Sequence, residues 1–416
     1  VLRHDADIEP HGRHGVRVRL TAPSLDSLFV ASCFLSTRFT VRVRDAETGV
    51  DLADEVVETA GGVAWAADGR SFFYVWVDGN HRPAKVMRHV LGTAAADDIE
   101  IRQEADAAFF ISVGKTQSDR FIVIDTHDHE TSEVRFLRAD NPYAEARLIA
   151  ERQAGTEYSI EHGVLGGQDV FFILTNADGA EDFKIVTAPV DDPGPQNWRD
   201  LVTHVEGRLI LDITVYRDYL VRLEREAGLP RIVIRHLPTG AEHAIAFDEE
   251  AYSLGIIDGL EYDTTTLRFM YSSMTTPTRI YDYDMAARTR VLRKEDEIPS
   301  GHDPADYETR RVFAPAPDGE TVPVSLLYRK GTPLDGSAPC LLYGYGAYGI
   351  TIPASFGITR LSLVDRGFVY AIAHVRGGKD KGYRWYSDGR REKKVNTFTD
   401  FIATADYLAA EKFTSR

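Results

Sequence analysis

The chain has 416 residues, too many for one ordinary compact domain, so we expect two domains or a repeat architecture. Its 43% hydrophobic and 27% charged residues are typical of a soluble globular protein with ample core material. The 64 acidic and 48 basic residues give a net charge of −16, which argues against a nucleic-acid partner.

The cysteines and the apolar runs indicate the cellular compartment in which we expect the protein. The two cysteines, Cys33 and Cys340, are far apart in sequence, so we expect no disulfide framework and a reducing, cytoplasmic compartment. No apolar run reaches the roughly 18 residues that a membrane span needs, and we expect no signal peptide. The first residue is Val1 rather than Met, so we expect a truncated or processed N-terminus.

A repeat occupies residues 1–300. Six segments each join a polar turn containing an aspartate to a run of β-branched and aromatic residues: 24–32, 66–77, 116–126, 166–176, 215–225 and 261–273. Their aspartates are Asp26, Asp68, Asp119, Asp169, Asp218 and Asp263, with spacings of 42, 51, 50, 49 and 45 residues. After most of these runs comes a second strand-like piece, at 41–49, 132–140, 183–192, 231–240 and 279–290. Several short strands at this period predict a β-propeller, seven-bladed with about six blades visible; a β-sandwich with accidental spacing is the alternative.

The pattern changes after residue 300. Residues 310–330 predict a hairpin with Asp318-Gly319 at its turn, followed by a short apolar strand at 339–342. A helix is predicted at 358–366 with Gly367 as its C-cap, and a buried strand at 368–375.

A second helix is predicted near the end of the chain. Its apolar face is expected to consist of Phe398, Phe401, Ile402, Ala405, Leu408 and Ala409. Asn396 or Thr397 is expected to cap its N-terminus. Alternating strands and helices predict an α/β domain with a parallel sheet over residues 301–416.

Two glycine-rich loops follow the predicted strands, YGYGAYG (343–349) and Arg376-Gly377-Gly378. Ligands of parallel sheets bind beyond the carboxyl ends of the strands, so these loops are candidates for a binding site; the alternative is that both are simply tight turns. The first loop lacks the Gly-Lys-Ser/Thr ending of a phosphate-binding loop, which we therefore exclude.

Several longer stretches carry a family resemblance: LLYGYGAYG, RLSLVDRGFVYAIAHVRGG, WYSDGRREKKVNTFTDFIA and MYSSMTTP. They resemble the oligopeptidase B branch of the prolyl oligopeptidase family of serine peptidases. The resemblance implies a substrate-gating propeller over 1–300 and the N-terminal portion of an α/β-hydrolase domain over 301–416. It also implies short peptide substrates cleaved after Arg or Lys, no cofactor, and neither a nucleic-acid nor a membrane partner. It leaves the oligomeric state open.

The resemblance also assigns two site residues. Tyr345 would donate its hydroxyl to the oxyanion hole, where one such donor is typically worth about 3–4 kcal/mol. Tyr348 would flank the substrate near the scissile bond. The alternative for both tyrosines is that their rings pack against the propeller.

The catalytic triad is not recognisable in the sequence. A hydrolase of this fold needs a G-x-S-x-G elbow followed by an aspartate and a histidine, and no such elbow occurs. We therefore expect the nucleophile, acid and base beyond residue 416, and the family's opening segment before Val1. The sequence is interpreted as an internal fragment that is inactive alone.

Two segments depart from the family pattern. Pro353-Ala354-Ser355 stands where oligopeptidase B sequences often carry two acidic residues, and Lys379-Asp380-Lys381 is more basic than usual. The first departure puts in doubt the preference for a second basic residue and part of the preference for Arg or Lys. A prolyl or broader-specificity peptidase is one alternative function, and a non-enzymatic propeller that binds a partner is another.

The remaining polar candidates are interpreted as structural. The histidines outside the loops lack the strand or helix period that would fix a metal site, so no metal is expected: His4, His11, His14, His127 and His129. His374 and Asp400 precede any nucleophile, so we expect a packed, hydrogen-bonded histidine and a carboxylate in the first turn of a helix. Trp385 and Tyr386 are expected to pack beneath the second loop.

Overall fold

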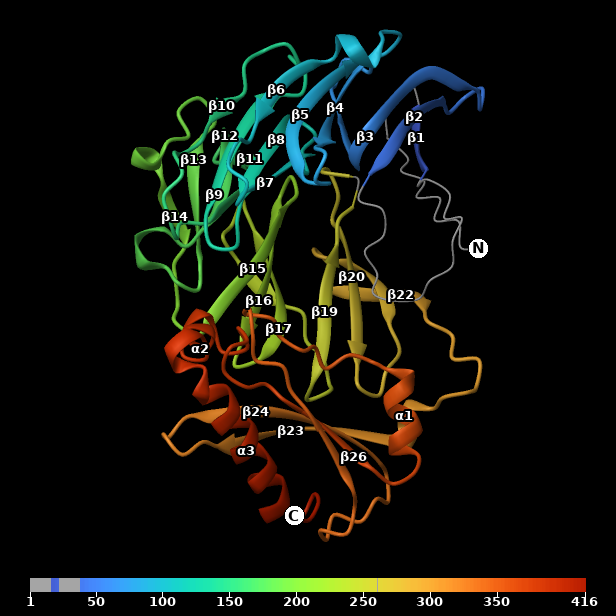
Figure 1. Ribbon diagram of the computed structural model, residues 1–416, viewed down its shortest axis with the longest axis vertical. Coiled ribbons are helices and arrows are strands. Elements are labelled where there is room, and N and C mark those ends of the chain that lie inside the picture. Colours follow the sequence, from blue (N-terminus) through green and yellow to red (C-terminus); the bar gives the residue numbers. More distant parts are fainter. Residues whose placement is uncertain (1–15, 22–37, 260) are drawn as a thin grey trace. The chain divides into compact units, whose positions relative to one another are not determined.

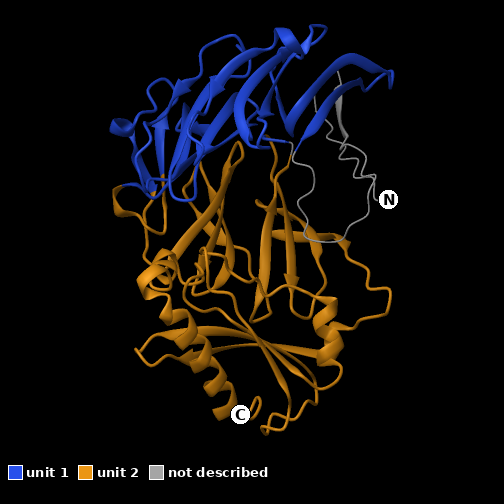
Figure 2. Cartoon of the chain, viewed as in Figure 1, with its two compact units in different colours: residues 1–177, 186–201, 260–262 blue, residues 178–185, 202–259, 263–416 orange. Residues whose placement is uncertain are grey.

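The computed structural model describes residues 16–21, 38–259 and 261–416, in which β-strands predominate (Figure 1). The chain divides into two compact units (Figure 2). One contains residues 1–177, 186–201 and 260–262, and the other contains 178–185, 202–259 and 263–416. The predicted domain boundary at residue 300 lies between the last strand of the repeat and a short 3-10 helix, and it stays a prediction.

The first sheet has six antiparallel strands. They are β1 (Val16–Thr21), β2 (Phe39–Asp45), β3 (Asp51–Trp65), β4 (Ser71–Val77), β5 (Pro83–Val90) and β6 (Ile99–Gln103). The long strand β3 pairs with β2 up to Thr59 and with β4 from Thr59 to Trp65, with a register shift between Thr59 and Val63. This one strand therefore joins two consecutive repeat units into a single sheet.

The next four sheets have four antiparallel strands each. They contain β7 (Phe110–Lys115), β8 (Phe121–His127), β9 (Ser132–Arg138) and β10 (Arg147–Leu148); β11 (Tyr158–Leu165), β12 (Gln168–Thr175), β13 (Lys184–Pro189) and β14 (Arg199–Val202); β15 (Arg208–Val215), β16 (Tyr219–Glu226), β17 (Leu229–His236) and β18 (Glu242–Ala244); and β19 (Tyr252–Ile257), β20 (Thr266–Ser273), β21 (Arg279–Asp284) and β22 (Thr289–Glu295). The predicted repeat is confirmed where it is described, since five of the six aspartate-led runs contain β4, β8, β12, β16 and β20. The run at 24–32 lies outside the described residues.

The repeated aspartates have identifiable structural roles. Asp68 Oδ1 accepts hydrogen bonds from the backbone N–H groups of Arg70 and Ser71, both at 2.8 Å, and so closes the turn before β4. Asp169 and Asp263 instead pair with an arginine of the preceding repeat, in the ion pairs Arg120–Asp169 (2.6 Å) and Arg217–Asp263 (2.5 Å). The period of the sequence therefore reflects both turn closure and contacts between neighbouring sheets.

The last sheet has the order β23-β24-β26-β25, formed by β23 (Tyr307–Pro315), β24 (Thr321–Arg329), β25 (Cys340–Tyr343) and β26 (Val369–Ala373). The hairpin prediction is confirmed, because Pro315 pairs with Thr321 around the Asp318-Gly319 turn. Only β25 and β26 run parallel, and β24 joins β26 antiparallel. The sheet is thus mixed rather than wholly parallel, because the hairpin supplies its first two strands.

Three α-helices accompany this sheet: α1 (Ile358–Val364), α2 (Tyr383–Ser387) and α3 (Val395–Ala410). Leu408 of α3 packs with Ala371 and Ala373, whereas Leu361 and Val364 of α1 pack with Ile372. Because alternate residues of a strand point to opposite faces, α3 and α1 cover opposite faces of β26. Single turns of 3-10 helix occur at Ala95–Asp97, Ala177–Gly179, Pro195–Asn197, Pro304–Asp306 and Arg391–Lys393.

The face that α3 buries matches the predicted one only in part, since Leu408 is buried and Phe401 packs against the same core. Thr397, Asp400, Thr404 and Leu408 are its buried residues, whereas Phe398 and Ile402 are 60% and 61% exposed. The helix turns this mostly polar stripe inward because Asp400 and Thr397 bind groups of the neighbouring loop.

The predicted N-cap of this helix is also wrong. The cap position is Lys394, which makes no side-chain capping bond. Asn396 Nδ2 donates to the carbonyl of Asp388 and Thr397 Oγ1 donates to that of Arg376, so both side chains hold other segments instead. No helix in the described part of the chain is long and apolar enough to cross a membrane.

Candidate functional site

The loops that follow β25 and β26 lie against each other. Gly349 N–H donates to the carbonyl of Gly377 at 2.9 Å, and Gly349 and Gly378 form an isolated parallel bridge. This meeting follows from the topology, because the carboxyl ends of two adjacent parallel strands end at the same edge of a sheet. The structure thus brings together the two glycine loops that the sequence made candidates for a binding site.

Gly346 is tightly enclosed at the centre of the first loop. Its φ is +69°, and a Cβ placed there would overlap Thr397 Cγ2 and lie 2.7 Å from Val375 Cγ2. Lys394 Nζ donates a hydrogen bond to the Gly346 carbonyl, and burial lowers the pKa of this ammonium group. Only glycine fits this backbone conformation and this packing.

Tyr345 and Tyr348 present their rings to solvent on this enclosed backbone. Tyr345 is 44% exposed and Tyr348 is 81% exposed. Tyr348 also has a φ of +55°, which is uncommon for a bulky residue and costs free energy. Tyr343, at the start of the loop, is 43% exposed, so the loop presents three exposed tyrosines at the carboxyl ends of the parallel strands.

The second loop is held by the buried guanidinium of Arg376. Its Nε and Nη2 donate to Asp400 at 2.9 and 2.5 Å, its Nη1 donates to Asp318 at 2.5 Å, and its backbone N–H also reaches Asp400. Burial alone would lower the pKa of Arg376, but the bonds to Asp400 and Asp318 outweigh it and raise the pKa above its usual value. The structural interpretation of Asp400 is confirmed. Its location in the first turn is not, since α3 begins five residues earlier at Val395.

A Ser-His-Asp arrangement lies directly behind this loop. His374 Nε2 is 2.9 Å from Ser325 Oγ, and His374 Nδ1 is 3.1 Å from Asp380 Oδ1. Ser325 is only 2% exposed and lies in the middle of β24, and His374 and Asp380 are also buried. A serine nucleophile must be exposed on a sharp turn to reach a substrate carbonyl, so this group is structural. The expected packed, hydrogen-bonded His374 is confirmed.

Short contacts also fix the segment around α2. Trp385 Nε1 donates to the carbonyl of His374 at 3.0 Å and its ring is buried, which confirms its predicted place beneath the loop. Asp182 accepts hydrogen bonds from Tyr383 N–H and Gly207 N–H, both at 2.6 Å. A carboxylate here satisfies one of the N–H groups left unpaired at the start of the helix.

The two segments that depart from the family pattern have different surroundings. Ala354 is buried, and the nearby Phe356 N–H donates to Ser272 Oγ at 2.9 Å. Lys381 pairs with Glu320 at 2.9 Å, whereas the Lys379 ammonium lies over the rings of Tyr383 and Tyr386 at 5.4 and 5.8 Å. The loop surroundings therefore carry the positive charge of Lys379 and lack an acidic pair at 353–355.

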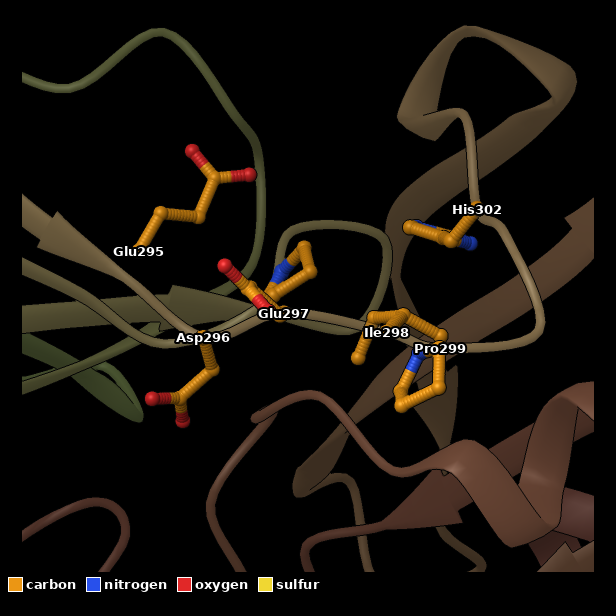
Figure 3. Close-up of a pocket in the computed structure, with 7 residues that line it drawn as sticks. Glu295, Asp296, Glu297, Ile298, Pro299 and His302 are labelled. Atoms are coloured by element: carbon orange, nitrogen blue, oxygen red, sulfur yellow. The ribbon is translucent and has the colours of Figure 1, made fainter.

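A separate pocket of about 430 Å³ lies along the segment that follows β22 (Figure 3). Its lining residues are Pro277, Glu295, Asp296, Glu297, Ile298, Pro299 and His302. Asp296 points away from Glu295 and Glu297 in Figure 3, Glu295 pairs with Arg279 at 2.8 Å, and His302 Nε2 lies 2.6 Å from the carbonyl of Thr275. These acidic groups diverge, so they do not form a common ligand set.

The histidines considered as metal ligands are not grouped into a metal site in the described part of the chain. Among the described residues, no group of three or more His, Cys, Asp or Glu side chains could hold a metal ion. His127 binds Asp125 at 2.5 Å, and this hydrogen bond raises the pKa of the imidazole. His4, His11 and His14 lie outside the described residues, as does Cys33.

Comparison with known proteins identifies the family. Residues 34–296 match the N-terminal β-propeller domain of prolyl oligopeptidase, and residues 354–416 match the prolyl oligopeptidase family. The chain belongs to the prolyl oligopeptidase family. Its fold is a β-propeller followed by the first part of an α/β-hydrolase domain, as the sequence predicted.

Individual relatives agree with this assignment. Dipeptidyl aminopeptidase BI of Pseudoxanthomonas mexicana is 40% identical over 91% of this chain and 52% of its own length. The structure of oligopeptidase B from Leishmania major matches with a TM-score of 0.83 and 32% identity, over 91% of this chain and 54% of that one. Oligopeptidase B from Trypanosoma brucei, with covalently bound antipain, matches with a TM-score of 0.81 and 30% identity, over 96% and 62%. The chain thus spans about half the length of the curated relatives it matches.

Sequence reasoning missed the residues that hold the loops. Lys394, Thr397 and Ser325 sit in segments whose patterns predict only a helix or a strand, and the pattern around Arg376 predicts only a turn. The one available signal was the set of polar residues at 397, 400 and 404, which recur at helical spacing beside the predicted apolar face.

Proposed function

We propose that the complete protein is a serine oligopeptidase that hydrolyses short peptides by acyl-enzyme chemistry, with a preference for Arg or Lys before the scissile bond. The observation that carries this proposal is the exposed Tyr345 side chain on an enclosed glycine loop, in a chain of this family. In this role Tyr345 donates to the oxyanion of the tetrahedral intermediate, and Tyr348 flanks the substrate. Serine, histidine and aspartate residues beyond position 416 supply the nucleophile, base and acid, and the propeller of residues 1–300 restricts entry.

In this mechanism, residues 1–416 contribute a hydrogen-bond donor that stabilises the negative charge of the oxyanion. When the serine attacks the carbonyl carbon, negative charge develops on the carbonyl oxygen. A fixed hydroxyl stabilises that charge because it needs little reorganisation during the reaction. The enclosure of Gly346 favours such a fixed donor.

A broader specificity is the second candidate, and the surroundings of the loop favour it. Lys379 places a cation there, and Pro353-Ala354-Ser355 supplies no carboxylate for a second basic residue. The relative named as a dipeptidyl aminopeptidase suggests a further form, in which a free amino-terminal dipeptide is released. Cleavage after proline and partner binding by a propeller without enzymatic activity are two further candidate functions.

The test uses protein expressed from the full open reading frame. Hydrolysis is compared for matched reporter peptides that end in Arg, Pro or Ala before the reporter, each with a free and with a blocked amino terminus. We expect the blocked Arg peptide to be cleaved fastest, and Tyr345→Phe to lower kcat about 100-fold or more. A preference for free dipeptides would replace the proposed specificity, and no cleavage by the folded protein would leave the propeller as a binding module.

A further inference from the structure

The Gly346 carbonyl, next to Tyr345 in the chain, is held by Lys394 and lies beside Thr397, both at the beginning of α3. Lys394 Nζ donates to it directly. Thr397 Oγ1 lies 3.4 Å from the same oxygen and makes its shorter hydrogen bond, 2.7 Å, to the carbonyl of Arg376. One short stretch of helix therefore binds both glycine loops.

The backbone around this carbonyl leaves no room for a side chain. A Cβ on Gly346 would lie 2.9 Å from the carbonyl oxygen of Arg376, and a Cβ on Gly377 would overlap the Gly346 carbonyl. Both glycines have positive φ values, +69° and +99°. The contact between the loops is consequently backbone against backbone, and a side chain at either position would separate them.

The helix that carries Lys394 and Thr397 is itself anchored. Asp400, one turn after Thr397, is fully buried and binds the Arg376 guanidinium through both carboxylate oxygens. Asn396 Nδ2 donates to the carbonyl of Asp388 at 2.9 Å. The start of α3 therefore acts as a fixed support for Gly346.

We propose that Lys394 and Thr397 are positioning residues for Tyr345: Lys394 holds the Gly346 carbonyl, Thr397 packs against Gly346 and binds the adjoining Arg376 carbonyl, and together they fix the tyrosine hydroxyl at the oxyanion position. This inference rests on the proposed oxyanion role of Tyr345. An electrostatic donor acts only within a narrow range of positions, so a small displacement of the loop lowers the rate without weakening substrate binding to the same degree.

The test compares Lys394→Met in two backgrounds of the full-length enzyme, with Tyr345 and with Tyr345→Phe. Methionine keeps a long apolar side chain and removes the ammonium donor. We expect kcat to fall about 10-fold or more in the Tyr345 enzyme with KM within about twofold, and to change less than about twofold when Tyr345 is already Phe. An equal loss in both backgrounds would show that Lys394 acts on the fold and would overturn the proposal.

A second pair of variants keeps the test decisive if Lys394→Met does not fold. Thr397→Val removes the hydroxyl at nearly constant shape, and Thr397→Ser retains it. We expect the valine variant to lower kcat and the serine variant to stay within about threefold of the parent, again only when Tyr345 is present. If Tyr345→Phe alone is as active as the parent, the proposed function of Tyr345 fails and this inference fails with it. If Tyr345→Phe lowers kcat but the Lys394 and Thr397 variants have the same effect with and without Tyr345, the positioning role fails and the proposed function of Tyr345 stands.

Discussion

The two loops that follow β25 and β26 are neighbours in space but use their side chains in opposite ways. The first loop exposes Tyr345 and Tyr348, whereas the second buries His374, Arg376 and Asp380. The first has no ion pair of its own among the described residues at 343–350, and the second is tied to Asp400 and Asp318. We call the first loop, residues 343–349, the presenting loop, and the second, residues 374–380, the holding loop. The comparison shows that polar side chains near a site can make it rigid without taking part in its chemistry.

The largest expected effect comes from breaking the holding loop at Arg376. Arg376→Met leaves the fully buried Asp400 carboxylate without its partner, so we expect unfolding free energy to fall by about 3–5 kcal/mol in urea titrations. Arg384→Met is the control, because its guanidinium is 62% exposed and pairs with Glu206 at 3.5 Å; it should cost under about 1 kcal/mol. Equal losses of unfolding free energy in the two variants would show that the buried Arg376 ion pairs stabilise the fold no more than the exposed Arg384 pair does.

The contact between the loops is tested at Gly377. Gly377→Ala combines a φ of +99° with a Cβ that overlaps the Gly346 carbonyl, so we expect a loss of about 2–4 kcal/mol. Gly367→Ala provides a matched control: its φ is +88°, but nothing lies within 4 Å of the added Cβ. We expect Gly367→Ala to lower the unfolding free energy only by the cost of placing an alanine in the left-handed backbone conformation, about 1–2 kcal/mol. Thermal or urea unfolding of both variants measures the difference.

The Ser-His-Asp group formed by Ser325, His374 and Asp380 tests whether buried polar side chains near the loops serve stability or catalysis. Ser325→Ala removes the partner of His374 Nε2, so we expect a stability loss of about 1–2 kcal/mol in urea unfolding, with the kcat of the full-length enzyme changed less than about twofold. Loss of all hydrolysis in a folded Ser325→Ala variant would contradict the structural interpretation. It would make Ser325, despite its burial, the nucleophile.

The smallest effect on stability is expected in the presenting loop. Tyr348 is 81% exposed, so Tyr348→Ala should change the unfolding free energy by less than about 0.5 kcal/mol. The same variant should raise KM for short peptides if the ring flanks the substrate. An unchanged KM, measured with three peptides of different length, would exclude that role for Tyr348.

Sequence patterns predicted the architecture well because it depends on local periodicity. The aspartate-led runs became strands, the 310–330 segment became a hairpin, and 368–375 contains the fully buried β26. Turn chemistry and the alternation of strand residues are properties of adjacent residues, so one chain is enough to reveal them. The family resemblance was likewise carried by continuous stretches of sequence.

The orientation of α3 could not be predicted in this way. Its apolar residues suggested a face with Phe398 and Ile402 inward, but the buried stripe contains Thr397, Asp400 and Thr404. The partners that decide this orientation, Arg376 and Gly346, lie more than twenty residues away in sequence. A helical pattern shows which residues share a face and does not show which distant groups that face will meet.

By itself, the sequence determined the repeat, the hairpin, the strands of the last sheet and the two glycine loops that follow them, because each depends on short-range backbone preferences. Only the tertiary structure decided that the loops touch, that Lys394 and Thr397 bind the Gly346 and Arg376 carbonyls, and that Ser325, His374 and Asp380 converge in the interior. Those contacts join residues from different strands and helices. The physical reason is that hydrogen bonds and ion pairs in a buried site depend on distances in space, which the order of residues leaves open.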